Sequence, residues 1–167
     1  MLDIAAFSRR YAVRRMTDAD ADVLLDFCRQ NTQFYEYCGA QPSRARVLDD
    51  LHVAPPGKDA SSKCYVGFYD GATLVAVMDL IDGYPEADCA FIGFFMMDKG
   101  LQGRGIGSDI ILEVCRYLGE ASFRTIRLAI AEDNPQATHF WRKNGFAVVQ
   151  RVPMDGWTAL VADKALS

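Results

Sequence analysis

The sequence lacks the features that would place it in several common classes of protein. Its five cysteines include no Cys-x-x-Cys pair, so we expect reduced thiols, as in a cytosol, and no metal site. A basic excess is also missing: the formal net charge of −4 argues against a nucleic-acid surface and suits a cationic or amine partner better. We recognise no signal peptide and no membrane-spanning run, and therefore expect a cytoplasmic protein.

What the sequence does contain fits one globular domain. Half of the 167 residues are hydrophobic, a quarter are charged, and no tract is of low complexity. A chain of this length buries roughly two thirds of its unfolded surface, which is enough for a stable core. Neither a repeat nor a linker divides it, so we expect a single domain over residues 1–167 with its core at about 11–162.

Apolar patterns and turn residues predict an α/β (α+β) fold with a mixed, mostly antiparallel sheet of six to seven strands and helices on both faces. The expected strands are 11–16, 64–69, 73–81, 89–97, 125–131, 147–152 and 157–162. The expected helices are about 17–28, 44–51, 106–118 and 134–144. The segment 31–43 is expected to separate the first two helices as an irregular break, and 54–63 to form a loop.

A glycine-rich turn, KGLQGRGIG, lies between the expected strand 89–97 and the helix that follows it. Such a turn is an anion site, because the first N–H groups of a helix lack helical partners and the helix dipole adds about half a positive charge. Two nucleotide fingerprints are absent. The phosphate-loop pattern fails because Ser108 and Asp109 follow Gly107 where a lysine is required, and the dinucleotide pattern fails because Ser108 occupies its third glycine position.

The stretch Gln102 to Gly107 does fit the pattern Q/R-x-x-G-x-G/A, and with it the chain resembles the GCN5-related N-acetyltransferase (GNAT) family. The resemblance covers about 11–162 and includes the order of elements and NPQATHFWRKNGF (134–146), an Asn-capped helix that ends at a Gly-Phe pair. It implies a GNAT-like fold and acetyl-CoA as acyl donor, with the pyrophosphate held by turn N–H groups. The residues it implies for acetyl-CoA binding are Phe95, Met96, Met97, Gln102, Gly103, Arg104, Gly105, Ile106, Gly107, Ser108, Asn134 and Trp141.

The resemblance also implies where the thioester lies. In the family's geometry the strand ending GFFMMD splays from the strand TIRLAIA, and the pantetheine arm lies in the gap. Backbone groups around Phe95 and Met97 would bind its amides and polarise the thioester carbonyl, which is worth about 3 kcal/mol when the donors are preorganised. Each of these residues also has an interpretation without a ligand. The strand around Phe95 and Met97 is then simply buried on both faces, Asn134 is an ordinary helix cap, and Arg104 is a solvated surface arginine.

One residue departs from the family pattern. Four residues before Gly145 the family commonly carries a tyrosine thought to protonate the departing thiolate, and this chain has Trp141, whose indole cannot do so. Catalysis does not require this tyrosine, since a thiol with a pKa near 8.5 leaves as an anion at a cost of about 2 kcal/mol at pH 7. Deprotonating a lysine-like amine costs more, about 4.6 kcal/mol, so a base is expected unless the acceptor is weakly basic.

The sequence offers several candidates for that base. They are Asp79, Asp82, Glu86, Asp88, Glu132 and Asp133, each of which is otherwise a solvated turn carboxylate. Our working hypothesis is that Asp79 or Glu132 deprotonates an amine through a water. Tyr35, Tyr37 and Tyr84 are candidate acids or pocket walls for the substrate, whereas His52 and His139 are read as structural or solvated.

Two functions fit these observations. The first is acetyl transfer from acetyl-CoA to a primary amine of a small molecule or peptide by direct attack in a ternary complex, since no nucleophilic Cys or Ser motif is present. The second is a sensor or interaction module that binds CoA with little turnover. A homodimer is compatible with either function, and the acceptor amine is not identified by the sequence.

Overall fold

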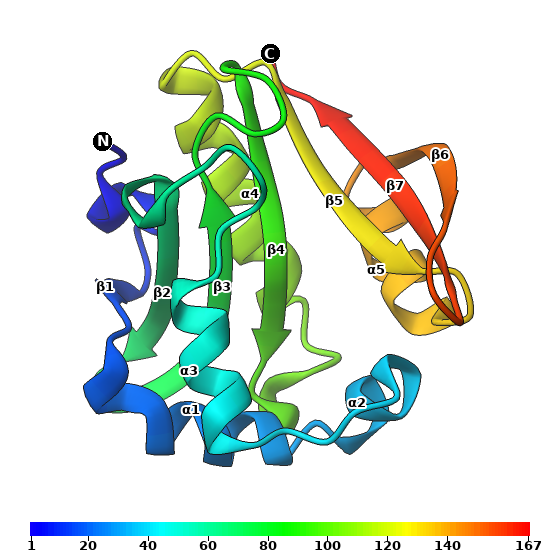
Figure 1. Ribbon diagram of the computed structural model, residues 1–167. Coiled ribbons are helices and arrows are strands. Elements are labelled where there is room, and N and C mark those ends of the chain that lie inside the picture. Colours follow the sequence, from blue (N-terminus) through cyan, green and yellow to red (C-terminus); the bar gives the residue numbers. More distant parts are fainter.

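The computed structural model describes residues 1–167, apart from the side chain of Cys38. Seven strands form one sheet in the order β1-β2-β3-β4-β5-β7-β6 (Figure 1). The strands are β1 (Ala12–Arg15), β2 (Lys63–Asp70), β3 (Thr73–Ile81), β4 (Cys89–Met97), β5 (Thr125–Ala131), β6 (Ala147–Pro153) and β7 (Thr158–Ala165). Only the β4–β5 pair is parallel, so the predicted mixed, mostly antiparallel sheet is confirmed.

The helices are α1 (Ala21–Arg29), α2 (Thr32–Cys38), α3 (Arg44–His52), α4 (Ile106–Glu120) and α5 (Pro135–Lys143). Short 3-10 turns lie at Ile4–Phe7, Asp18–Asp20, Ala60–Ser62 and Lys99–Leu101. Several predicted helix caps are present. The Ser43 side chain accepts a hydrogen bond from the Arg46 N–H, and Asn134 accepts one from the Ala137 N–H. None of these helices is both long and apolar enough to cross a bilayer.

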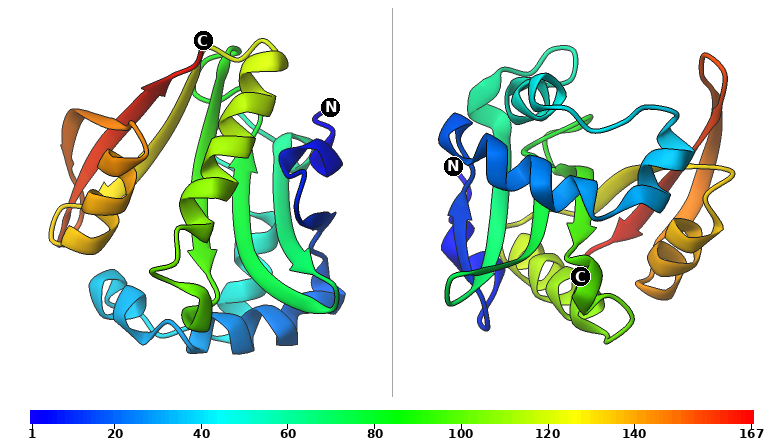
Figure 2. Two further views of the ribbon diagram at one scale, coloured as in Figure 1. Left: turned by 180° about the vertical axis from the view of Figure 1, so that it is seen from behind. Right: turned by 90° about the horizontal axis from the view of Figure 1, so that it is seen from below.

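Helices cover both faces of the sheet because its side chains alternate in direction. On β3, Met78 and Leu80 join the core beneath α4 and α5, whereas Val77 joins the core beneath α1, α2 and α3. Figures 1 and 2 show α3 on one side of the central strands and α4 on the other. Two apolar layers therefore sandwich β2, β3 and β4.

The segment 31–43 is where the prediction of an irregular break was wrong. Residues Thr32–Cys38 form α2, and the helix ends at Gly39, whose φ of 68° is left-handed. The local pattern is too short and polar to signal a helix by itself. Tertiary packing stabilises it instead, because Tyr35 is buried and the Phe34 ring lies edge-on to Phe94 of β4.

Strand β4 contains an irregularity that shapes the centre of the molecule. Asp79 pairs with Phe94 and Leu80 with Ile92, so Gly93 is an extra residue in β4, a β-bulge. The bulge shifts the alternation of side chains along the strand. Beyond it, Phe94 and Met96 face α1, α2 and α3, and Met97 faces α4 and α5.

Candidate functional site

Strands β4 and β5 separate just beyond the point where the bulge begins. Their parallel ladder runs from Cys89 opposite Thr125 to Ile92 opposite Leu128 and stops there, although both strands continue. The opening is visible in Figure 1 as a divergence of the two ribbons. The splay that the family resemblance implies is thus present in the structure.

The hydrogen-bond alternation of β4 decides which backbone groups face this opening. The Asp98 N–H donates to the Val75 carbonyl at 2.8 Å, so in this antiparallel pair every second residue of β4 bonds to β3. Phe95 and Met97 fall between those positions and direct their backbone groups away from β3, toward β5. The backbone groups of Met96 point toward β3, so Met96 is less suited than Phe95 and Met97 to bind a ligand in the opening.

The glycine turn lies directly after β4 and begins α4. Gly105 caps the helix with a φ of 78°, and the first helical bond runs from the Asp109 N–H to the Gly105 carbonyl at 3.1 Å. The N–H groups of the first turn are therefore without helical partners. A Cβ at Gly103 or Gly105 would meet nothing within 4 Å, whereas one at Gly107 would lie 3.3 Å from Met97 and Phe140. Gly107 thus permits close packing of α4, and Gly103 and Gly105 leave the outer side open.

The Gln102 side chain is engaged within the protein, whereas its predicted role in acetyl-CoA binding stays a prediction. Its side-chain amide donates to Asn31 Oδ1 at 2.6 Å, and Asn31 is buried at the junction of α1 and α2. Both amides also lie 3.4 Å from the Met97 carbonyl. Gln102 therefore fixes the turn to β4 and to the α1–α2 junction. Ile106 is half-buried and Arg104 is exposed at the turn.

An aromatic cluster lines the α5 side of β4. The rings of Phe140 and Trp141 both lie 6.0 Å from the Phe95 ring, and Phe146 lies 5.1 Å from Trp141. Trp141 is buried in this cluster, so it is a structural neighbour of Phe95. Ser108 Oγ accepts a hydrogen bond from the Asn144 amide at 3.2 Å, which ties the start of α4 to the end of α5.

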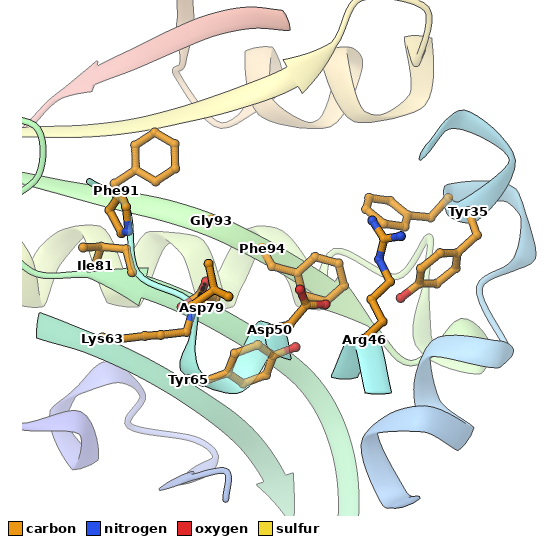
Figure 3. Close-up of a pocket in the computed structure, with 13 residues that line it drawn as sticks. Tyr35, Arg46, Asp50, Lys63, Tyr65, Asp79, Ile81, Phe91, Gly93 and Phe94 are labelled. Atoms are coloured by element: carbon orange, nitrogen blue, oxygen red, sulfur yellow. Dashed lines mark hydrogen bonds and ion pairs between the residues drawn. The ribbon is translucent and has the colours of Figure 1, made fainter. Parts of the chain in front are cut away.

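A separate pocket of about 380 Å³ lies on the other face of the sheet, between α2, α3 and strands β2, β3 and β4 (Figure 3). We call it the α3 pocket. Its lining residues are Phe34, Tyr35, Arg46, Asp50, Val53, Pro55, Lys63, Tyr65, Asp79, Ile81, Phe91, Gly93 and Phe94. Because of the bulge, β4 contributes Phe91, Gly93 and Phe94, three of four consecutive residues, to the same wall of this pocket.

An ion pair occupies one end of the α3 pocket. Lys63 Nζ lies 2.7 Å from Asp79 Oδ2, and both residues are buried. Asp79 Oδ1 is also buried and has no hydrogen-bond partner among the described residues. Burial raises the pKa of Asp79 above its ordinary value, and the hydrogen bond from Lys63 opposes that rise. The Asp79 side chain is 12% exposed at the pocket, whereas its unsatisfied Oδ1 is itself buried.

Gly93 makes room for this carboxylate. A Cβ at position 93 would lie 2.8 Å from Asp79 Oδ2, closer than real Cβ contacts allow. Tyr65 lies opposite Asp79 on β2, and burial raises its pKa well above the ordinary value, so its hydroxyl stays protonated. Asp50, at the exposed α3 side, has its pKa raised by partial desolvation, which Arg46 opposes.

The structure separates the predicted catalytic and substrate residues. Asp79 and Tyr35 line the α3 pocket, but Tyr37 and Tyr84 do not. Tyr84 instead packs edge-on against Phe91, with ring centroids 5.6 Å apart. Glu132 accepts a hydrogen bond from Arg151 at 2.7 Å and lines a second, more open hollow beside α5. Asp79 and Glu132 are therefore not brought together.

Sequence reasoning missed most of the α3 pocket. The local sequence predicts a loop at Lys63, but the residue begins β2, and Lys63 and Tyr65 lie on the face of that strand opposite Cys64 and Val66. Arg46 and Asp50 are four residues apart on a helix, a spacing that places them on one face. The lone glycine in the apolar run of β4 was the available signal for a bulge.

Comparison with known proteins gives a consistent result. The family model described as acetyltransferase (GNAT) family matches residues 24–146. No curated protein sequence matches the chain. Among solved structures, an acetyltransferase from Thermus thermophilus has a TM-score of 0.75 at 23% identity, covering 93% of this chain and 97% of that one.

Two further structures were solved with coenzyme A. The PaiA N-acetyltransferase of Thermoplasma acidophilum, in complex with coenzyme A, has a TM-score of 0.67 at 17% identity and covers 93% of this chain and 98% of its own. AAC(6')-Ib, in complex with ribostamycin and coenzyme A, has a TM-score of 0.72 at 15% identity, with 93% of each chain covered. At such identities the likeness shows the fold.

We expect Lys63→Met to destabilise the protein by about 3 kcal/mol near neutral pH, because it leaves the buried Asp79 carboxylate without its cation. The loss of Lys63 raises the native pKa of Asp79 further, so the penalty should be small below the unfolded pKa of about 3.9 and grow as pH rises. Urea unfolding at about pH 4.5 and about pH 8 measures this. The double variant Lys63→Met/Asp79→Asn is the control and should lack the pH dependence; an equal loss at both pH values for the single variant contradicts the assignment.

Gly93→Ala should cost about 2 kcal/mol of stability, since its methyl group would press on the Asp79 carboxylate. Asp79→Ala removes that carboxylate, so the double variant should be scarcely less stable than Asp79→Ala alone. A double-mutant cycle measured by urea unfolding gives the coupling. Strictly additive effects would show that the two residues do not interact.

Proposed function

Since the chain belongs to the acetyltransferase (GNAT) family, we propose that it transfers an acetyl group from acetyl-CoA to the primary amine of a small molecule or peptide. The observation that carries the proposal is the opening beside β4 that leads to the unpartnered N–H groups of α4. Two binding regions meet across this strand. The donor is proposed to bind on the β5 side, and the acceptor in the α3 pocket.

The chain's own groups fit the donor. Strand β4 offers the Phe95 backbone groups and the Met97 N–H to an extended, amide-containing arm, in the way that it would pair with one more strand. The Met97 carbonyl already accepts from Asn31 and Gln102. The first turn of α4 offers N–H groups and a helix dipole to a pyrophosphate, and Gly103 and Gly105 present no side chain against it. Arg104 adds a positive charge beside this turn.

The proposed step is a direct attack that conserves atoms and charge. The amine nitrogen forms a bond to the acetyl carbon, the carbon–sulfur bond breaks, and sulfur leaves with the electron pair. A backbone N–H of β4 stabilises the charge that develops on the carbonyl oxygen. Asp79 is the proposed base, because it lines the α3 pocket and its Oδ1 has no hydrogen-bond partner. Since Oδ1 is buried, we propose that the side chains around it shift to admit the amine or a water. The raised pKa of Asp79 improves it as a proton acceptor.

Neither Trp141 nor Asn134 is assigned a proton-transfer role. Trp141 is buried among aromatic rings, so the thiolate must be protonated by water or by another group. The Asn134 side chain caps α5, and we propose that this cap positions the β5–α5 corner beside the donor. Cytoplasmic location and a homodimer stay predictions.

The alternative function is a CoA-binding sensor or interaction module with little turnover, and Trp141 is the feature that favours it. The two functions differ in one measurement, which is thiol release from acetyl-CoA in the presence of a panel of primary amines. Release with any amine supports the enzyme. Tight CoA binding without release supports the module.

Asp79→Asn should lower kcat/KM by about a hundredfold or more at pH 7, the usual range for loss of a general base. The wild-type rate should fall as pH decreases through the raised pKa of Asp79, because the carboxylate must be ionised to accept a proton. The variant should lack this acidic limb and recover as pH approaches the amine's own pKa. Glu132→Gln is the matched control, expected to retain the wild-type pH profile; a full rate in Asp79→Asn rejects Asp79 as the base.

Arg104→Glu tests the donor side with little effect on the fold, since an acidic residue before a helix N-terminus is favourable. It should weaken acetyl-CoA binding by about tenfold, because a negative charge replaces a positive one beside the pyrophosphate. S-acetylpantetheine has no pyrophosphate, so kcat/KM for this donor should be unchanged. An equal loss with both donors, measured by thiol release, would place the pyrophosphate elsewhere.

A further inference from the structure

The α3 pocket carries information about the acceptor that goes beyond the transfer reaction. We infer that the acceptor is a small monoamine bearing one aromatic group, an aryl-alkyl amine. This inference rests on the proposed acetyl transfer, because it takes the α3 pocket as the acceptor site. Three properties of the pocket support it: its charge, its walls and its size.

The charges in the pocket are balanced. Arg46 and Lys63 contribute two positive charges, Asp50 and Asp79 two negative ones, and the Lys63–Asp79 pair is in direct contact at 2.7 Å. A polycationic acceptor would need an excess of carboxylates, and its second ammonium group would meet Lys63 or Arg46. A single amine needs one carboxylate, and Asp79 lines the pocket with an Oδ1 that has no partner and becomes accessible when the neighbouring side chains shift.

The walls beyond this carboxylate are mainly apolar, and they include the aromatic residues Phe34, Tyr35, Tyr65, Phe91 and Phe94. Figure 3 places Lys63 and Asp79 at one end of the pocket, Tyr35 and Arg46 at the other, and Tyr65 and Phe94 between them. Phe34 is already edge-on to Phe94 at 5.4 Å, a geometry that an additional ring can extend. The amine and the aromatic group of the acceptor therefore have separate, adjoining places.

The volume limits how large the acceptor is. At about 380 Å³ the pocket is near the small end of the range of about 300–1,000 Å³ found for ligand sites. One ring on a short chain fills such a space. A trisaccharide or a folded polypeptide segment does not fit wholly within it, so the part of the acceptor that the pocket holds is limited to about one ring and a short chain.

The test compares acceptors that differ in one property. Thiol release from acetyl-CoA is measured with 2-phenylethylamine, with 2-methoxyethylamine, which replaces the ring by a polar group, and with spermidine. We expect kcat/KM for 2-phenylethylamine to exceed that for 2-methoxyethylamine by about 30-fold, from burial of the ring. Spermidine should be the poorer substrate by a similar factor.

Two variants connect this preference to the pocket. Phe94→Ala and Phe91→Ala remove aromatic walls and should reduce the ratio of the two kcat/KM values toward one. Trp157→Ala, which alters an exposed aromatic residue on the β6–β7 turn, should leave the ratio unchanged. Because the ratio compares two acceptors on the same protein, partial unfolding of a variant does not alter it.

The outcomes separate this inference from the proposed function. A preference for spermidine, or equal use of the aromatic and the polar amine, overturns the inference while acetyl transfer stands. An aromatic preference that survives in both phenylalanine variants also overturns it, because the ring then binds elsewhere. If no amine causes thiol release, the proposed function itself fails.

Discussion

The parallel ladder between β4 and β5 stops at Ile92 and Leu128, and the arrangement of the whole site depends on that stop. A sheet normally satisfies its backbone groups by continuing to pair. Here the β5 side of β4 is left without a strand partner for its last residues, beside the aromatic cluster of Phe95, Phe140 and Trp141. The turn that follows adds more unpartnered N–H groups, at the start of α4. Strand pairing is thus absent at the place where an extended ligand can form the same backbone hydrogen bonds.

The bulge at Gly93 relates this edge to the opposite face of the sheet. By inserting one residue, it places Phe91, Gly93 and Phe94 along one wall and leaves Phe95 directed toward α5. The absence of a side chain at position 93 also leaves space for the Asp79 carboxylate, and Lys63 stabilises its negative charge. A single glycine therefore sets the direction of the aromatic side chains and the position of the buried acid.

The central strands were predictable because local signals agree with tertiary structure there. The predicted bounds of β3, β4 and β5 match the observed ones, since apolar runs end at clear turn residues such as Gly71. The glycine turn and the capped α5 were also predictable from local sequence, whereas the splay of β4 followed only from the family resemblance. Helix α2 was not, because its stability comes from burial of Tyr35 rather than from its own sequence. The α3 pocket was missed because Lys63 and Asp79 meet only once the strand register is known.

The amide pair of the buried Asn31 and the more exposed Gln102 has a consequence for how two ligands would influence each other. Gln102 belongs to the turn before α4, and Asn31 immediately precedes α2, which supplies Phe34 and Tyr35 to the α3 pocket. One hydrogen bond thus joins the two regions across the end of β4. Coupling free energies are reciprocal. If a ligand at the turn changes the affinity of the pocket for its own ligand through this bond, then a ligand in the pocket changes the affinity of the turn by the same factor.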